Sequence, residues 1–286
     1  MRVLADHGAP LPGLRRVTSA GAPVPADVVA KMRELLPEAA QFWTPYGATE
    51  CLPVAVIEGR ELQLTREATE QGAGTCVGRP VPPNEVRLIA ISDDAIADWS
   101  DVVELGAETI GEITVAGPTV TDEYFNRPQA TALAKIRETL PDGRVRIVHR
   151  MGDLGRMDAQ GRLWFCGRKS HRVRTELGGL YTEQVEPVFN THPDVARTAL
   201  VGVGEPGKQR PVLCVEMRQG LPKAEHERVL AELRRHALGY VHTARIETFL
   251  VHPGFPVDIR HNAKITREHL APWATKKMYQ VHFQGE

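Results

Sequence analysis

The stretch Arg150-Met151-Gly152-Asp153-Leu154 lies near the middle of the chain and places an aspartate directly after a glycine. Gly152 allows the backbone to approach a ligand closely, because it carries no side chain. The carboxylate of Asp153 can accept two hydrogen bonds at once, which suits the neighbouring hydroxyls of a ribose. These residues predict a loop that carries an acidic side chain. Taken alone, they fit an aspartate in an ordinary surface turn better than a ligand site.

The residues that follow predict a hairpin and then a junction. Asp158-Ala159-Gln160-Gly161 has the composition of a turn, and Arg162 to Phe165 has that of a short strand. The polar segment from Gly167 to His171 then separates two regions with different patterns. We therefore expect one domain over residues 1–169 and a second over residues 170–286.

Composition narrows the class of protein. The chain has 286 residues, 42% of them apolar, and a formal net charge of −1. This length suits two domains of ordinary size or one large domain, and this charge argues against a nucleic-acid-binding protein. The four cysteines show no C-x-x-C spacing, which predicts reduced thiols. No apolar run reaches the roughly 18 residues of a membrane span. We expect a cytoplasmic protein without a transmembrane segment.

A strand, a turn of small residues and a helix are predicted near the beginning of the chain. Leu14 to Ala20 is expected to be the strand, and Ala26 to Leu36 the helix, which Pro37 ends. Between them lies Gly21-Ala22-Pro23. Such turns present backbone amides and carbonyls to ligands, although Gly21 could simply make the turn.

Tyr46-Gly47-Ala48-Thr49-Glu50 combines several groups that suit a nucleotide. Tyr46 offers a flat face on which a purine could stack, and Gly47 lets the chain fold tightly beside it. Thr49 supplies a hydroxyl for a phosphate oxygen. Glu50 supplies a hard oxygen for Mg²⁺, which takes few protein ligands. The combination is more specific than any one of these residues.

The remaining elements predict an α/β region with a small β subdomain, followed by a compact α+β domain. Residues 75–117 form the expected subdomain, with strands over Val86–Ile91 and Gly111–Val115. A helix over Gln129–Glu138 and a strand over Val145–Val148 follow. The α+β domain is expected to contain helices over Thr182–Asn190, Lys223–Ala237 and Thr266–Ala274, and strands over Ala196–Val203, Val212–Glu216 and Ile246–Val251. Lys264 stands in a loop, where its position alone fits a solvated lysine.

Together, these segments resemble the adenylate-forming superfamily of AMP-binding enzymes, which includes acyl-CoA synthetases and luciferases. The resemblance covers nearly the whole chain in the order of the family. It is carried by Ser19–Pro23, Tyr46–Glu50, Gly111–Val115 with Gly117 and Tyr124, Arg150–Leu154, Gly167-Arg168 and Lys264.

The resemblance implies ATP and Mg²⁺ as cofactors and assigns a role to each matching position. The residues implied to bind the nucleotide are Gly21, Ala22, Pro23, Tyr46, Gly47, Thr49, Asp153 and Arg168. Glu50 would hold Mg²⁺, and the hinge would comprise Lys169, Ser170 and His171. Lys264 would be the catalytic residue, bridging the carboxylate and α-phosphate oxygens. Attack of a carboxylate on phosphorus brings anions together and requires cations aimed at them.

Two segments are similar to the β-lactone synthetases of bacterial long-chain olefin biosynthesis, namely Thr44–Val54 and Phe255–Ile265. This resemblance implies adenylation of a long-chain β-hydroxy acid by ATP. The acid's own hydroxyl then closes a β-lactone ring, and AMP and pyrophosphate are released. It also implies association with other enzymes of olefin biosynthesis.

The sequence departs from the family pattern at three places. The Ser/Thr/Gly-rich phosphate loop does not occur in residues 1–286 and is expected upstream of Leu14, so we expect the chain to be the C-terminal part of a two-domain enzyme. His171 stands at the hinge where Asp or Lys is usual. Ala263 replaces a glycine before Lys264, which predicts a stiffer loop.

Two other functions stay open. One is a fatty acyl-CoA or fatty acyl-AMP ligase, which shares the adenylation chemistry. The other is a non-catalytic fragment or binding module that retains the fold, which the missing phosphate loop favours for the chain by itself. For lactone closure, His171 and His261 are candidate bases.

Overall fold

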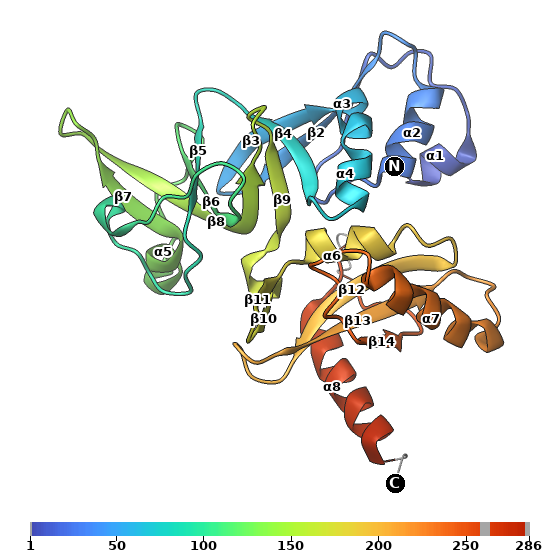
Figure 1. The fold of residues 1–286 in the computed structure, drawn as a ribbon. Coiled ribbons are helices and arrows are strands. Elements are labelled where there is room, and N and C mark those ends of the chain that lie inside the picture. Colours follow the sequence, from blue (N-terminus) through green and yellow to red (C-terminus); the bar gives the residue numbers. More distant parts are fainter. Residues whose placement is uncertain (1, 258–263, 284–286) are drawn as a thin grey trace. The chain divides into compact units, whose positions relative to one another are not determined.

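The computed structural model describes residues 2–257 and 264–283 (Figure 1). Contacts between residues divide the chain into two compact units. Unit 1 comprises Met1–Glu67 and Thr75–Lys169, and unit 2 comprises Ala68–Gly74 and Ser170–Glu286. Within the described residues, no helix is both long and apolar enough to cross a membrane.

Unit 1 is built on a nine-stranded sheet. Eight strands follow the order β1-β2-β3-β4-β9-β8-β6-β5, and β7 pairs with β8. Only the β1–β2 pair among them is parallel. The strands are β1 (Arg16–Thr18), β2 (Gln41–Ala48), β3 (Cys51–Glu58), β4 (Thr75–Pro80), β5 (Glu85–Ile89), β6 (Gly111–Ala116), β7 (Lys135–Thr139), β8 (Val145–Met157) and β9 (Leu163–Arg168).

Short helices pack at the two ends of this sheet. In Figure 1, α1 (Arg2–His7), α2 (Ala26–Leu35) and α3 (Gly59–Leu64) gather at the end formed by β2, whereas α5 (Pro128–Ala134) lies beside β7 and β8. The helix α4 (Arg66–Glu70) and the 3₁₀ helix η1 (Trp99–Asp101) complete the elements before β7. A core of buried side chains from β3, β6, β8 and β9 holds the centre of the sheet.

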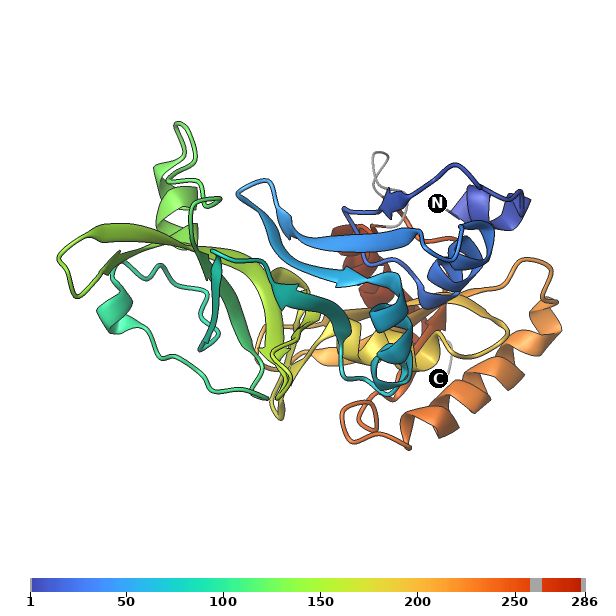
Figure 2. The ribbon, with the colours of Figure 1, turned by 90° about the horizontal axis from the view of Figure 1, so that it is seen from above.

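Unit 2 is a three-stranded sheet with helices on both faces (Figure 2). The strands are β12 (Val195–Val203), β13 (Arg210–Met217) and β14 (Thr248–Val251), in that order. Successive side chains of a strand point to opposite faces, which explains two separate cores. Leu200 and Leu213 face α6 (Thr182–Phe189) and α7 (His226–Ala237), while Ala199 and Val212 face α8 (Arg267–Phe283).

The other elements of unit 2 are short. A hairpin joins β10 (Val173–Thr175) and β11 (Gly178–Leu180), and the 3₁₀ helix η3 (Lys223–Glu225) precedes α7. The 3₁₀ helix η2 (Lys169–His171) begins on the last residue of unit 1.

Most expected strands and helices occur within a few residues of their expected ends, but three expectations were wrong. Residues 150–154 are not a loop, since they lie inside the 13-residue strand β8. Lys135–Thr139 is not helical, because it forms β7 and pairs with β8 across the turn around Gly143. Helix α8 continues to Phe283, well past Ala274. His261 and Ala263 lie outside the described residues.

Candidate active site

A bulge in β8 shapes the surroundings of Asp153. On the partner strand β6, Glu112 pairs with Leu154 and Thr114 pairs with Arg150, so three residues of β8 stand opposite one residue of β6. Gly152 lies in this bulge with a φ of 65°, a conformation that strains residues with a side chain. The bulge interrupts the pairing with β6 at Asp153, which stays paired with Arg168 of β9.

Asp153 is held by two other residues predicted to bind the nucleotide. The hydroxyl of Tyr46 donates to Oδ2 of Asp153 at 2.7 Å, and Nη1 of Arg168 lies 3.1 Å from Oδ1. Asp153 and Arg168 pair directly across β8 and β9, which explains their contact. Burial, and then the charge of Asp153, raise the pKa of Tyr46 well above its usual range, so this hydroxyl remains a donor.

The carboxylate of Asp153 is the type of acceptor that suits the hydroxyls of a ribose. It is 6% exposed, its Oδ2 accepts from Tyr46, and its Oδ1 lies beside Arg168. An ionised carboxylate accepts up to about four hydrogen bonds, so one such group can meet protein donors and ligand hydroxyls together.

The turn Gly21-Ala22-Pro23 lies at the same end of the sheet as Tyr46. β1 and β2 are parallel, with Thr18 opposite Trp43, and the amide of Ser19 continues the pairing by donating to the carbonyl of Trp43 at 3.0 Å. Two parallel strands end at the same edge, so the turn after β1 and Tyr46 near the end of β2 share it.

The turn between β2 and β3 carries Thr49 and Glu50. Gly47 allows this turn to be tight, because a Cβ there would lie 2.6 Å from the carbonyl oxygen of Cys51. Thr49 is exposed and Glu50 is half-buried. The predicted metal ligand therefore stands directly beside the predicted phosphate contact.

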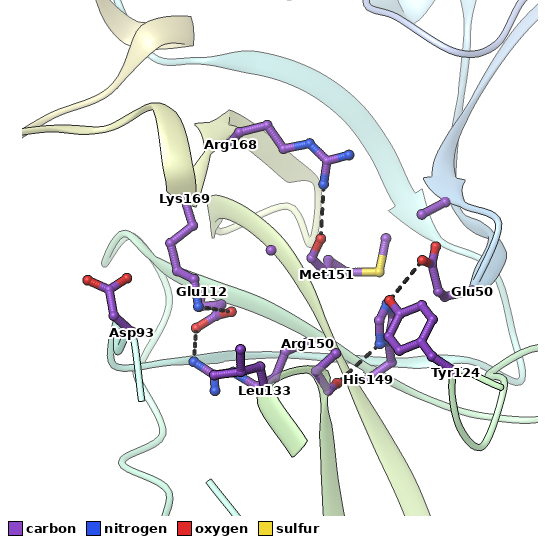
Figure 3. A pocket seen from close by; sticks show the side chains of 13 residues that line it. Glu50, Asp93, Glu112, Tyr124, Leu133, His149, Arg150, Met151, Arg168 and Lys169 are labelled. Carbon is purple, nitrogen blue, oxygen red and sulfur yellow. Dashed lines mark hydrogen bonds and ion pairs between the residues drawn. The ribbon is translucent and has the colours of Figure 1, made fainter. Parts of the chain in front are cut away.

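Glu50, Arg168 and Lys169 line a pocket of about 340 Å³ within unit 1 (Figure 3). Its other walls include Tyr124 and His149, together with residues of the β8 bulge. The pocket brings Glu50 from the β2–β3 turn together with Arg168 from the end of β9. The remaining residues that line it are Ala48, Asp93, Glu112, Leu133, Ala134, Arg150, Met151 and Gly152.

Glu50 is held as a charged carboxylate, the form that a cation would require. The hydroxyl of Tyr124 donates to its Oε1 at 2.8 Å, as Figure 3 shows. Burial raises the pKa of Glu50, but the hydrogen bond from Tyr124 and the nearby Lys135 and His149 outweigh burial, so the pKa is lowered overall. Burial and Glu50 raise the pKa of Tyr124 to about 12, which keeps it a donor.

The described residues fit Mg²⁺ held mainly by a substrate. They contain no group of three or more His, Cys, Asp or Glu side chains that could hold a metal ion. Mg²⁺ commonly binds through one or two carboxylates and takes its remaining ligands from phosphates and water. A single carboxylate such as Glu50 is compatible with this mode of binding.

Three side chains around Glu50 had no predicted role. Besides Tyr124, these are Lys135, whose Nζ donates to the carbonyl of Thr121, and His149, whose Nδ1 lies 3.2 Å from the carbonyl of Ala134. Burial and the charge of Lys135 lower the pKa of His149 to about 4, so its ring is neutral. For Lys135 and His149, the signal in the sequence was a charged or titratable residue within a segment that forms a strand.

Lys169, predicted as a hinge residue, is fixed to unit 1. Its Nζ donates to Oε1 of Glu112 at 2.8 Å and to the carbonyl of Ser92 at 2.8 Å. Glu112 is fully buried, and its Oε2 accepts from Arg150 at 2.7 Å. Arg150 and Lys169 thus both bind the buried carboxylate of Glu112, which fixes the chain directly after β9 (Figure 3).

The remaining predicted residues belong to unit 2. Nε2 of His171 lies 3.9 Å from Oε1 of Glu268, in the first turn of α8. Lys264 is exposed and immediately precedes Ile265, which forms a β-bridge with Val257. Ser170 is the first residue of unit 2 after the junction.

The chain is similar in sequence to known proteins. Residues 1–125 match the model of the AMP-binding enzyme family. The chain is 68% identical over 278 residues to an olefin β-lactone synthetase of Stenotrophomonas maltophilia and 67% identical over 277 residues to one of Xanthomonas campestris. Each match covers 97% of this chain and 50% of the relative.

The fold agrees as well. The amide bond synthetase McbA of Marinactinospora thermotolerans superposes with a TM-score of 0.67 at 27% identity, over 91% of this chain and 46% of that one. The chain spans about half the length of the curated relatives it matches. From its family match, its relatives and its fold, the chain belongs to the AMP-binding family of adenylate-forming enzymes.

Proposed function

We propose that a protein containing this chain uses ATP to adenylate a long-chain β-hydroxy acid and then closes it to a β-lactone. The carboxylate attacks the α-phosphorus and pyrophosphate leaves. The β-hydroxyl oxygen then attacks the acyl carbon, AMP leaves, and the hydroxyl proton passes to a base or to water. The observation that carries this proposal is the 68% identity, over nearly the whole chain, to an olefin β-lactone synthetase.

The nucleotide is assigned to the Tyr46–Asp153–Arg168 cluster and the neighbouring turn Gly21–Pro23. Asp153 accepts the ribose hydroxyls, while Tyr46 and Arg168 hold its carboxylate in place through the contacts described above. A buried acceptor that is already positioned loses little entropy when the ligand binds. Gly47 and Thr49 complete the nucleotide side near the α-phosphate.

Mg²⁺ is assigned to Glu50. The ion supplies charge neutralisation at the phosphates. The role of the chain is to keep the Glu50 carboxylate ionised and directed, through the hydrogen bond from Tyr124.

Lys264 is assigned the cation that meets the developing charge during adenylation. Lys264 is exposed and directly precedes Ile265, which is held in a β-bridge. This arrangement suits a side chain that must reach a substrate from a backbone in a defined position. Lys169, Ser170 and His171 are the proposed hinge about which unit 2 turns. Since Lys169 is anchored to Glu112, the rotation begins after it, at Ser170 and His171.

Lys264→Ala tests this assignment in a protein of the full length of the relatives. We expect kcat for acid-dependent release of AMP to fall by about 10²–10³ with little change in KM, because the contact forms mainly in the transition state. The matched control is Lys208→Ala, an exposed loop lysine of unit 2. Equal activity of the two variants would show that Lys264 is not the catalytic cation.

A further inference from the structure

One buried ion pair in unit 2 connects α6, β12 and α8, the helix that begins just after Lys264. Oε1 of Glu186 in α6 lies 2.8 Å from Nη1 of Arg267, the first residue of α8. Nη2 of Arg267 donates to Oε2 of Glu186 at 3.0 Å. The two side chains are 8% and 13% exposed, so water screens the pair weakly.

Glu186 also binds the edge of the sheet. β12 is an edge strand of the three-stranded sheet, and the amide of Leu200 in this strand donates to Oε1 of Glu186 at 2.8 Å. This carboxylate therefore joins α6, the edge of β12 and the beginning of α8. The planar guanidinium of Arg267 donates a hydrogen bond through Nη2 to one oxygen and lies close to the other oxygen through Nη1. Its direction is therefore constrained as well as its distance, which a lysine would not provide.

The same region holds the residues next to Lys264. Ile265 forms an antiparallel bridge with Val257, and the amide of Thr266 donates to the carbonyl of Pro256 at 2.9 Å. Arg267 follows at once. Three consecutive residues after Lys264 are thus tied to fixed parts of unit 2, while Lys264 itself is exposed.

We propose that Arg267, held by Glu186, is a positioning residue for Lys264. This inference rests on the proposed function of Lys264 and extends it to the pair that sets where the lysine backbone stands. The pair fixes the first turn of α8, and that turn fixes the residue from which the Lys264 side chain extends. A displacement of about 1 Å at a catalytic group can lower a rate by about 10²-fold, so a distant anchor can matter to the reaction.

The test uses the full-length protein and a double-mutant cycle. We expect Arg267→Met to lower kcat for acid-dependent AMP release by about 10- to 100-fold, with the affinity for AMP unchanged. Arg267→Lys should recover only part of the rate, and Glu186→Gln should resemble Arg267→Met. Combined with Lys264→Ala, Arg267→Met should cost nothing more, because it acts through that lysine. Arg235→Met, at an exposed position of α7, is the matched control.

Amide hydrogen exchange gives a second measurement that needs no activity. The amides of Ile265 and Thr266 should exchange faster in Arg267→Met and in Glu186→Gln than in Arg235→Met. Unchanged exchange, or additive losses of kcat in the Lys264→Ala background, would overturn the positioning role. If Lys264→Ala alone were fully active, the proposed function of Lys264 would fail, and the exchange rates would still decide whether the pair holds this loop. Should Arg267→Met not fold, Glu186→Gln carries the same comparison.

Discussion

At the scale of single residues, Asp153 is the proposed acceptor for the ribose hydroxyls of the nucleotide. We expect Asp153→Ala to weaken the affinity for ATP by about 1–3 kcal/mol, because the ribose hydroxyls lose a charged acceptor and Tyr46 and Arg168 lose theirs. Isothermal titration of the full-length protein measures this loss. Asp142→Ala, in the exposed turn before β8, should bind ATP as the unchanged protein does. Equal affinities would reduce Asp153 to a structural residue of the bulge.

His149 predicts a dependence of stability on pH. Its pKa is lowered to about 4 in the folded chain by burial and Lys135, whereas in the unfolded chain it is near 6.5. The unfolded chain therefore binds more protons between these values, and stability is lost as pH falls from about 6.5 towards 4. This effect is worth about 3 kcal/mol.

Urea unfolding at pH 7 and pH 4 measures this effect. In His149→Gln the loss between the two pH values should be smaller by up to about 3 kcal/mol. His7→Gln, at an exposed position of α1, serves as the control and should behave like the unchanged chain. An undiminished loss in His149→Gln would show that another group causes it.

The sequence marked single candidate residues of the site, but it did not indicate which of them contact one another. Asp153, Tyr46 and Arg168 were each predicted to bind a nucleotide, but their mutual contacts depend on a register across the five strands from β2 to β8 that no local pattern contains. Tyr124 carried the family resemblance without a role, and it donates to Glu50 from 74 positions away. Roles that arise from long-range contacts are visible only once the sheet is assembled.

At the scale of elements, the bulge in β8 depends on Gly152. We expect Gly152→Ala to lower the free energy of unfolding by about 1–2 kcal/mol, because a φ of 65° strains a residue with a Cβ. Space is not the cause, since the nearest atom to that Cβ, Nη1 of Arg168, would lie 3.8 Å away. Gly106→Ala, in open space without a positive φ, should be nearly neutral. Thermal unfolding compares the two, and equal melting temperatures would contradict the strain.

Local patterns predicted elements well where one face of a strand or helix is buried, as in α2, β12 and α7. They were wrong at Lys135–Thr139, whose composition suits a helix, because pairing with β8 decides its conformation. They were also wrong at Asp153, because Gly152 signalled a loop and instead makes a bulge inside a strand. In both places tertiary pairing outweighs local preference.

At the scale of the whole molecule, each unit holds a different part of the proposed chemistry. The described residues of unit 1 carry the proposed nucleotide and Mg²⁺ ligands, and unit 2 carries Lys264. Each unit has its own buried core, so each can keep its part of the site rigid while the hinge residues change conformation. This division suits a reaction in which the cation is needed for adenylation and is then withdrawn.

In the proposed reaction, the β-hydroxyl oxygen of the activated acid attacks the acyl carbon of the same molecule. The tethered β-hydroxyl attacks within one molecule, and its high effective concentration helps to offset the strain of the four-membered ring. The most direct measurement gives the full-length protein ATP, Mg²⁺ and a long-chain 2-alkyl-3-hydroxy acid, with and without CoA, and identifies the product by mass spectrometry. We expect AMP release that does not require CoA and a product lighter than the acid by one water. A reaction that requires CoA and yields a thioester would contradict this expectation and would identify an acyl-CoA ligase.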